Sequence, residues 1–147
     1  MCWGFCKQTS EAEDIYQEVL LRIWKGLDGF KGKAKLSTWI YRITMNTCLY
    51  WQKKQKRTRS WEPVNQLNIS TPIKNAEEQL LYDEKMEQLK KAIQLLKESD
   101  RAVALLLLEG LSYQEIAEVM GLTVNNVGVK ISRIKTRIKK IMESILV

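Results

Sequence analysis

The stretch that decides the fold is SYQEIAEVMGLTVNNVGVKISRIKTRIKKIM, which runs from Ser112 to Met142. Ser112 is a candidate helix N-cap, and Glu115 three residues later completes a capping box, which satisfies free amides at a helix start. Gly121 predicts a turn with positive φ that ends this short helix, and Thr123 predicts the cap of the next one. Together these signals predict a helix-turn-helix.

The second helix of this motif is predicted to be amphipathic and basic. Between Val124 and Met142 the chain has six Lys and Arg residues and no acid. A recognition helix enters the major groove of DNA by its N-terminal part. Apolar residues recur at three- and four-residue steps, which is the spacing of one helix face, at Val124, Val127, Ile131, Ile134, Ile138 and Ile141.

The first turns of this basic helix hold the side chains best suited to DNA. Asn125 and Asn126 are candidates for reading bases, because a carboxamide pairs with both N6 and N7 of adenine, and Val129 suits a thymine methyl group. Farther along the helix, phosphate contacts are expected, and a solvated basic face is the plainer interpretation of that end. The expected DNA surface consists of Thr123, Asn125, Asn126, Val129, Lys130, Arg133 and Arg137.

The charge of the chain is divided between two basic stretches and an acidic remainder. The net charge is +7, but residues 31–59 alone hold nine basic residues and no acid. The basic helix described above is the second such stretch, and it lies far away in the sequence. Two separate basic surfaces indicate two contact points on a nucleic acid rather than one general attraction for polyanions.

The composition excludes several classes of protein. With 147 residues and 45% hydrophobic residues, the chain is expected to fold as a soluble protein. No apolar run approaches the ~20 residues of a membrane helix. The N-terminal MCWGFCKQTS lacks the order of a signal peptide, so we expect a cytoplasmic protein without membrane insertion.

The sequence offers no set of residues for catalysis, a metal or a cofactor. There is no histidine, and three cysteines cannot complete a four-ligand zinc set without carboxylates. Their odd number argues against a disulfide framework, so we expect free thiols. We also find neither a phosphate-binding glycine loop nor a nucleophile with a base, and therefore expect no enzyme.

The pattern along the chain predicts an all-α protein with two small helical domains joined by a linker. The domains are expected at residues 1–57 and 76–147, with the linker at 58–75, where both prolines lie and no period persists. In the second domain, Asp100 is a candidate cap for a short helix before the helix-turn-helix, which makes four helices there.

The first domain is expected to contain two helices, at about 11–27 and 37–57. The loop between them, from Asp28 to Leu36, carries glycines and lysines. The second helix mixes aromatic residues with cations, the combination that binds unpaired strands, although Trp39 and Trp51 also suit a core. We expect inward faces formed by Ile15, Tyr16, Val19, Leu20, Ile23, Trp24 and Leu27 in the first helix and by Leu36, Ile40, Ile43 and Thr47 in the second.

Three stretches, in their order and spacing, resemble the sigma-70 family of RNA polymerase initiation factors, in its extracytoplasmic-function group. EAEDIYQEVLLRIWKGLDGFKG at 11–32 resembles polymerase-binding region 2.2, and LSTWIYRITMNTCLYWQKKQKR at 36–57 resembles the promoter-melting and minus-10 regions. EGLSYQEIAEVMGLTVNNVGVKISRIKTRIKKI at 109–141 resembles region 4, which reads the minus-35 element. The resemblance implies a factor that directs core RNA polymerase to promoters.

The resemblance also implies surfaces and partners. The first helix would face the clamp helices of the β′ subunit, which gives the apolar Leu21 a partner on an otherwise polar face. Further implied partners are the β flap, promoter DNA and an anti-sigma factor. The implied polymerase-binding residues are Asp14, Gln17, Glu18, Leu21 and Arg22, and the implied minus-10 residues are Lys33, Lys35, Trp39, Arg42, Asn46, Lys53, Lys54 and Arg57.

Some positions depart from the family pattern. Met45 and Tyr50 stand where the family often has charged residues, and Gly128 occupies a recognition-helix position that often carries a DNA-contacting side chain. Only ten residues precede the first matching stretch, which predicts a shortened N-terminal domain. Two alternatives therefore remain at this point: a stand-alone helix-turn-helix regulator, or a shortened adaptor that binds partners without initiating transcription.

Overall fold

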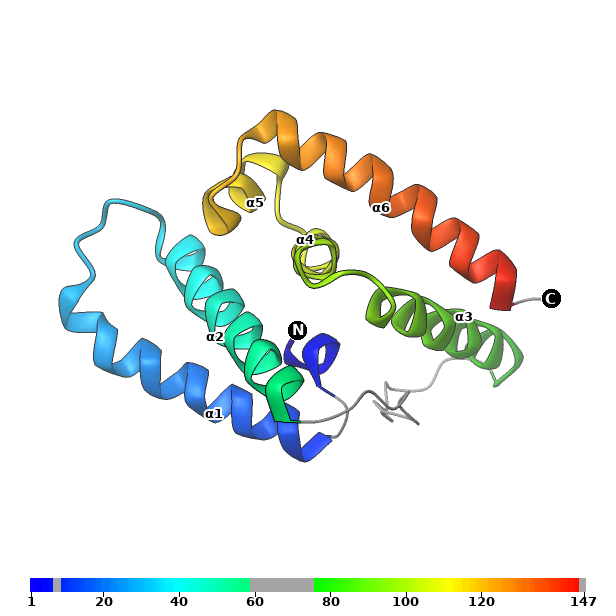
Figure 1. The fold of residues 1–147 in the computed structure, drawn as a ribbon, viewed down its shortest axis with the longest axis horizontal. Helices are drawn as coiled ribbons and strands as arrows, with labels where there is room; N and C mark the ends of the chain where they lie inside the picture. Colours follow the sequence, from blue (N-terminus) through cyan, green and yellow to red (C-terminus); the bar gives the residue numbers. More distant parts are fainter. Residues whose placement is uncertain (7–8, 59–75, 146–147) are drawn as a thin grey trace.

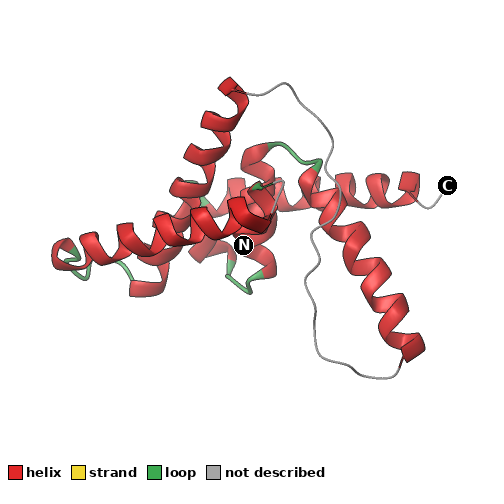
Figure 2. Ribbon diagram, turned by 90° about the horizontal axis from the view of Figure 1, so that it is seen from below, coloured by secondary structure: helices red, strands yellow, loops and turns green. Residues whose placement is uncertain are grey.

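The structure is a computed structural model that describes residues 1–6, 9–58 and 76–145. All regular elements in these ranges are helical, which confirms the predicted all-α fold (Figure 2). The expected linker at 58–75 lies outside the described residues except for Thr58. The elements in chain order are η1 (Cys2–Phe5), α1 (Thr9–Gly26), η2 (Leu27–Gly29), α2 (Leu36–Thr58), α3 (Ala76–Gln94), α4 (Glu98–Leu108), α5 (Tyr113–Met120) and α6 (Val124–Ile145).

The helix-turn-helix forms as its local signals predict. The Ser112 hydroxyl accepts a hydrogen bond from the Glu115 amide at 3.1 Å and so caps α5. Gly121 ends α5 with a φ of 68°, in the left-handed region that favours glycine. The Thr123 hydroxyl accepts from the Asn126 amide at 3.2 Å at the start of α6. These contacts confirm both predicted caps and the predicted turn.

The expected cap of α4 is wrong. The helix begins at Glu98, with Lys97 at the N-cap position and no capping side chain. Asp100 therefore lies within the first turn of α4, where a negative charge still interacts favourably with the helix dipole. Its carboxylate is engaged elsewhere, by Lys130 of α6 at 2.9 Å.

The predicted inward face of α1 is only partly correct. Ile15 and Val19 are buried, at 0% and 5% exposure, and Ile23 is half-buried. The other four expected members are exposed: Tyr16, Leu20, Trp24 and Leu27. The reason is that α1 packs on α2 and on the short η1, which together cover only the strip around Ile15 and Val19 and leave the rest of the predicted apolar face open. In α2, Leu36 is likewise exposed, whereas Thr47 is buried and Ile40 and Ile43 are half-buried.

One hydrophobic core joins the N-terminal and C-terminal halves. α2 packs between α1 and α5, and the N-terminal η1 packs on α1, α2 and α3 (Figure 1). A Cβ added to Gly4 would lie only 2.5 Å from Leu105 Cδ1. Glycine at this position therefore allows η1 to approach α4 closely, and Phe5 and Cys6 become part of the shared core.

A buried arginine fixes the turn between α3 and α4. The Arg101 guanidinium donates to the carbonyl oxygens of Gln94 at 2.5 Å, Leu96 at 3.0 Å and Ile93 at 3.4 Å. Ile93 and Gln94 end α3, where carbonyls lack partners inside the helix, and Leu96 lies in the turn that follows. Burial lowers the pKa of Arg101, while the nearby Glu98 opposes this effect. The side chain thus satisfies a helix end from within the core.

Among the described helices, none is long and apolar enough to cross a membrane.

Candidate nucleic-acid interface

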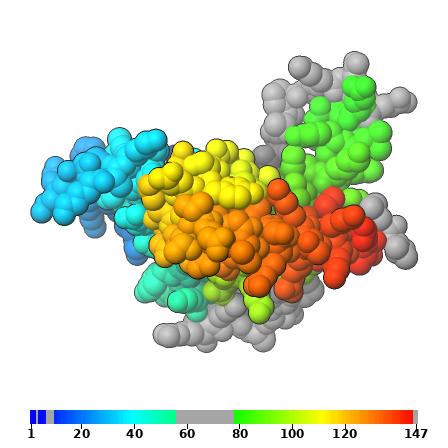
Figure 3. Space-filling model, turned by 90° about the horizontal axis from the view of Figure 1, so that it is seen from above, coloured from blue at the N-terminus to red at the C-terminus, as the bar shows by residue number. Residues whose placement is uncertain are grey.

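The outward face of α6 is the first part of the candidate interface. Val127, Ile131 and Ile134 are buried against the other helices, so the opposite side of α6 faces solvent. Figure 3 shows α6 running uncovered along one face of the molecule. The exposed residues on or beside this face are Thr123, Asn125, Asn126, Val129, Arg133 and Arg137. Six of the seven residues predicted for minus-35 DNA are therefore accessible together.

Lys130, the seventh predicted residue, has partners within the protein. Its ammonium group donates to the Asp100 carboxylate at 2.9 Å and to the Ser99 hydroxyl at 3.3 Å. The Lys130 and Asp100 side chains are 29% and 23% exposed, so the pair is partly shielded from water. In this arrangement Lys130 ties α6 to the start of α4, and the exposed Arg133 and Arg137 carry the outward positive charge.

The second part of the candidate interface lies on α2. Arg42, Asn46 and Lys53 are exposed, and their spacing of four and seven residues places them on one helix face. Lys54 is also exposed, but it lies on a different side of α2. The side chain of Arg57, the remaining residue predicted for this helix, lies outside the described residues.

The loop before α2 presents lysines, while the tryptophan beside it packs inward. Lys33 and Lys35 are exposed, and Gly32 has a φ of 70°. Trp39 is half-buried, with its ring centroid 5.2 Å from that of Phe30. A Cβ on Gly26 would lie 3.0 Å from the Trp39 ring, so the end of α1 also packs closely on it. In this structure Trp39 supports the loop more than it offers a free face for stacking.

Arg42 connects α2 to the helix-turn-helix. Its guanidinium donates to the backbone carbonyl of Glu118 in α5 at 2.7 Å. Tyr41, the neighbouring residue, has its pKa raised by burial and by the charges of Glu109 and Glu115. The first helix of the helix-turn-helix therefore lies directly against the helix that carries the expected minus-10 residues.

The expected polymerase-facing side of α1 is exposed. Asp14, Gln17 and Leu21 are open to solvent, and Glu18 accepts a hydrogen bond from Arg22 at 2.9 Å. The structure also adds an apolar row that sequence reasoning placed in the core. Tyr16, Leu20 and Trp24 are 57%, 47% and 76% exposed and follow each other at four-residue steps, and Trp24, three residues after Leu21, lies beside it on the helix surface. In the sequence, the sign of this apolar row was Leu21, an apolar residue on an otherwise polar face.

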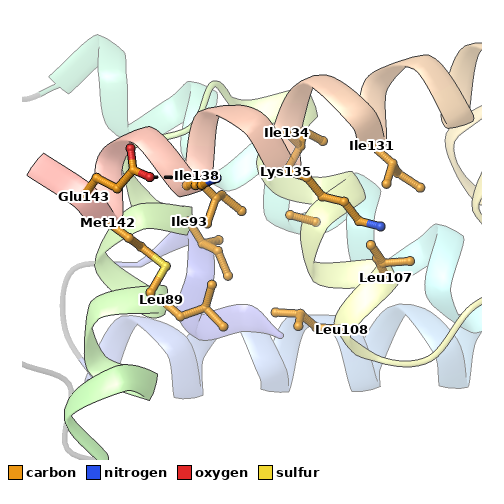
Figure 4. A pocket seen from close by; sticks show the side chains of 12 residues that line it. Leu89, Ile93, Leu107, Leu108, Ile131, Ile134, Lys135, Ile138, Met142 and Glu143 are labelled. Atoms are coloured by element: carbon orange, nitrogen blue, oxygen red, sulfur yellow. Dashed lines mark ion pairs between the residues drawn. The ribbon is translucent and has the colours of Figure 1, made fainter.

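An apolar groove lies on the inner side of α6. It has a volume of about 490 Å³ and is formed between α3, α4 and α6, with Leu89 and Leu108 opposite Ile138 (Figure 4). Lys139 and Glu143 stand at its edge and form a 4.0 Å ion pair. Sequence reasoning identified the α6 stripe but not this groove. One helix thus presents a polar, basic face on one side and an apolar groove on the other.

Within the described ranges, no group of three or more acidic, cysteine or histidine side chains could hold a metal ion. The fold and these surfaces define a helical DNA-binding protein with a helix-turn-helix at its C-terminal end.

Comparison with known proteins gives the family. The sigma-70 region 2 model matches residues 1–58, and the sigma-70 region 4 model matches residues 86–138. The ECF RNA polymerase sigma-E factor of Escherichia coli K12 is 30% identical over 139 residues, which cover 88% of this chain and 73% of that protein. RNA polymerase sigma factor YlaC of Bacillus subtilis is 29% identical over 133 residues, covering 89% and 77%.

A solved structure agrees with the fold. The sigma factor RpoE of Bartonella quintana, in complex with the anti-sigma factor NepR, has a TM-score of 0.77 at 19% identity over 97% of this chain and 87% of that one. The chain belongs to the extracytoplasmic-function group of the sigma-70 family of RNA polymerase sigma factors. Its function is that of a sigma factor, which directs RNA polymerase to promoters.

Proposed function

We propose that this protein starts transcription through separate surfaces for core polymerase and for the two promoter elements. The exposed side of α1 binds the β′ clamp helices of core polymerase. The loop at residues 31–35 and the outer face of α2 hold the unpaired minus-10 strand. The outward face of α6 reads the minus-35 duplex, and the two expected domains at 1–57 and 76–147 carry the two DNA contacts.

The observation that carries this proposal is the paired arrangement of two basic surfaces on one core. α6 offers carboxamides near its capped N-terminus and arginines farther along, the order expected for base reading followed by phosphate contacts. α2 offers a guanidinium, an amide and an ammonium group on one face. A stand-alone operator-binding protein would need only the first of these surfaces.

The contact between Arg42 and α5 has a consequence for this function. Because the Arg42 guanidinium is bound to the Glu118 carbonyl, it is not free for DNA in this arrangement. We infer that promoter binding separates α5 from α2 and releases Arg42. Releasing Arg42 by itself gives up one hydrogen bond from a charged donor, which contributes about 1.5–3 kcal/mol. Separating the two helices also uncovers the side chains packed between them, so DNA contacts must supply the remaining free energy.

We assign the apolar groove on α6 to the β flap of the polymerase. Its lining residues lie on the side of α6 opposite the DNA face, so both ligands can be bound at once. An anti-sigma factor that fills the same groove would exclude the β flap without touching the recognition face. We place the protein in the cytoplasm, where the polymerase acts.

A run-off transcription assay with purified core polymerase and a promoter library tests the whole assignment. We expect transcripts that depend on this protein and that begin downstream of a shared pair of sequence elements. Duplex binding without open complexes would support a stand-alone regulator instead. Binding to a partner protein without transcripts would support an adaptor.

The minus-35 surface is tested by comparing R133A with K135A. Both variants remove one positive charge from α6, but Arg133 lies on the outward face and Lys135 lines the groove. We expect R133A to weaken duplex binding about tenfold, as for loss of one direct contact, and K135A to change it by less than about threefold. Fluorescence anisotropy at fixed salt measures both. Equal losses would mean that only overall charge matters.

The polymerase surface is tested by comparing L21A with L80A. Both leucines are exposed, at 53% and 63%, but Leu21 lies on α1 and Leu80 on α3. If Leu21 enters an apolar contact, its truncation costs about 1–2 kcal/mol of binding, or about tenfold in Kd. Titration of labelled core polymerase measures this loss, and L80A should bind like the wild type. An unchanged affinity for L21A would exclude this side of α1.

A further inference from the structure

The three cysteines of the chain gather where η1 meets α2. The Cys48 thiol donates a hydrogen bond to the Cys2 sulfur, with 3.9 Å between the two Sγ atoms. The Cys6 thiol donates to the Cys2 backbone carbonyl at 3.1 Å. All three are free thiols, as expected from the sequence. None of the three is among the residues assigned above to polymerase or DNA.

The environments of these thiols differ. Cys48 is completely buried and Cys6 is 4% exposed, whereas Cys2 is half-buried and accessible to small molecules. The hydrogen bond from Cys48 lowers the pKa of Cys2 to about 7, against the effect of its own burial. The same hydrogen bond and burial raise the pKa of Cys48, and burial raises that of Cys6 to about 12. Cys2 is therefore the one that ionises near neutral pH, and the thiolate is the reactive form.

We propose that Cys2 and Cys48 are a redox-sensitive thiol pair, which closes to a disulfide when the protein meets a hydroperoxide. The Cys2 thiolate attacks one oxygen of hydrogen peroxide, the O–O bond breaks, and the departing hydroxide takes up a proton to form water. Cys2 is then a sulfenic acid. The Cys48 sulfur attacks the Cys2 sulfur, the S–O bond breaks, and the oxygen leaves as a second water with the Cys48 proton.

The electrons and atoms of this sequence balance. The two thiols lose two electrons in total, one molecule of peroxide gains them, and two molecules of water form. Excess thiol, such as dithiothreitol, reduces the disulfide back to the two thiols by exchange. Cys6 takes no part, because its sulfur is directed at a backbone carbonyl rather than at a second sulfur.

Closing the bond requires a movement that the fold can provide. A disulfide has a length of about 2.05 Å, so one sulfur must move by about 2 Å from the 3.9 Å separation. Cys48 lies inside the 23-residue helix α2, whereas Cys2 lies in the four-residue η1. Rotation of the Cys2 side chain with a small shift of η1 is therefore the easier movement.

This movement connects the thiol pair to the contact between the two halves. η1 reaches α4 through Gly4, which lies against Leu105, and through Phe5, whose ring centroid is 5.9 Å from the Arg101 guanidinium carbon. Drawing Cys2 towards α2 shifts η1 relative to α4. Oxidation should therefore change how the C-terminal half is held, as well as joining residues 2 and 48.

The experiment oxidises the full chain with hydrogen peroxide and counts the thiols after denaturation. We expect the wild type to lose two of its three thiols and C6S to lose both of its thiols. In a tryptic digest of C6S, the peptide 1–7 should be linked to the peptide 43–53, and dithiothreitol should separate them. C6S is needed because Cys2 and Cys6 lie in the same tryptic peptide.

The control variants assign the two roles. C2S should lose thiols about tenfold more slowly than the wild type, because the reactive thiolate is gone. C48S should stop at the Cys2 sulfenic acid, which dimedone traps and mass spectrometry locates. Since Cys48 is buried, C48A serves as a second variant, and thermal melts establish that each variant is folded.

Several outcomes would overturn the proposal. These are C6S keeping both thiols under peroxide, a Cys2–Cys6 link in the wild type, and a disulfide between two chains on non-reducing gels. Equal rates of thiol loss in C2S and the wild type would also overturn it. None of these readouts requires polymerase or DNA, so the result is independent of the proposed function.

Discussion

The C-terminal half follows its sequence signals closely, whereas the N-terminal helix pair does not. In the helix-turn-helix, Ser112, Gly121 and Thr123 each occupy the predicted cap or turn. In α1, the expected inward face is mostly open, and Trp24 is 76% exposed. Both halves have strongly patterned helices, so the strength of the pattern does not explain the difference.

The difference lies in how far along the chain the partner of each side chain is found. A cap satisfies amides two or three residues away, so its partner is fixed by the neighbouring sequence. An apolar side chain needs a partner from a remote element, and a periodic pattern states only that a helix face is apolar. The exposed row on α1 therefore indicates that apolar periodicity is shared by core-forming and partner-binding faces.

The largest expected effect comes from Arg101, which the sequence patterns did not single out. R101A would remove the guanidinium donor from two carbonyls at the end of α3 and from that of Leu96 in the following turn, and we expect it to lower the free energy of unfolding by about 4 kcal/mol. Urea denaturation followed by circular dichroism measures this change. The result would show how much stability in the C-terminal half comes from side-chain hydrogen bonds that reach beyond a cap, to carbonyls five to eight residues away.

R101M serves as the control for this prediction. Methionine keeps an apolar stem beside Phe5 but has no donor, so most of the loss should remain. If R101M were as stable as the wild type, the stem rather than the hydrogen bonds would hold the turn. If R101A lowered the free energy of unfolding by less than about 1 kcal/mol, Arg101 would behave like a surface residue.

Two variants in α1 compare its buried side with its exposed side. Ile15 is fully buried, so I15A should cost about 3 kcal/mol, whereas W24A should change the free energy of unfolding by less than about 0.5 kcal/mol. Thermal and urea unfolding of both variants measure the two effects. A large loss in W24A would mean that this side of α1 is packed against the protein, as the sequence pattern suggested.

The sequence therefore predicted the fold class, the caps at Ser112 and Thr123 and the accessible side of α6, because these depend on residues close in the chain, but it misplaced the start of α4 at Asp100. It placed Trp39 at a DNA surface, but the packing of that ring on Phe30 depends on how a loop returns to α2. It could not identify the partners of Lys130 and Arg42, since these lie 30 and 76 positions away. The same limit hid the apolar groove, which exists only after three helices meet.

A stabilising effect is expected at Gly128 in α6. A Cβ there would lie 3.8 Å from the Tyr113 ring, which is ordinary contact, and alanine is favoured over glycine in a helix by about 1 kcal/mol. G128A should therefore raise the free energy of unfolding by about that amount, as measured in urea. If G128A were instead less stable than the wild type, α6 would need glycine at this position for close packing. Local helix propensity would then fail to predict stability in the C-terminal half.

The continuity of α6 has a mechanical consequence. Its 22 residues form one helix about 33 Å long, with the proposed base-reading residues near its start and much of the apolar groove nearer its end. A stiff rod transmits a tilt from one end to the other. Under the proposed assignment, a protein that entered the groove and moved the last turns of α6 would change the angle at which Asn125 and Asn126 meet the bases, without touching the DNA.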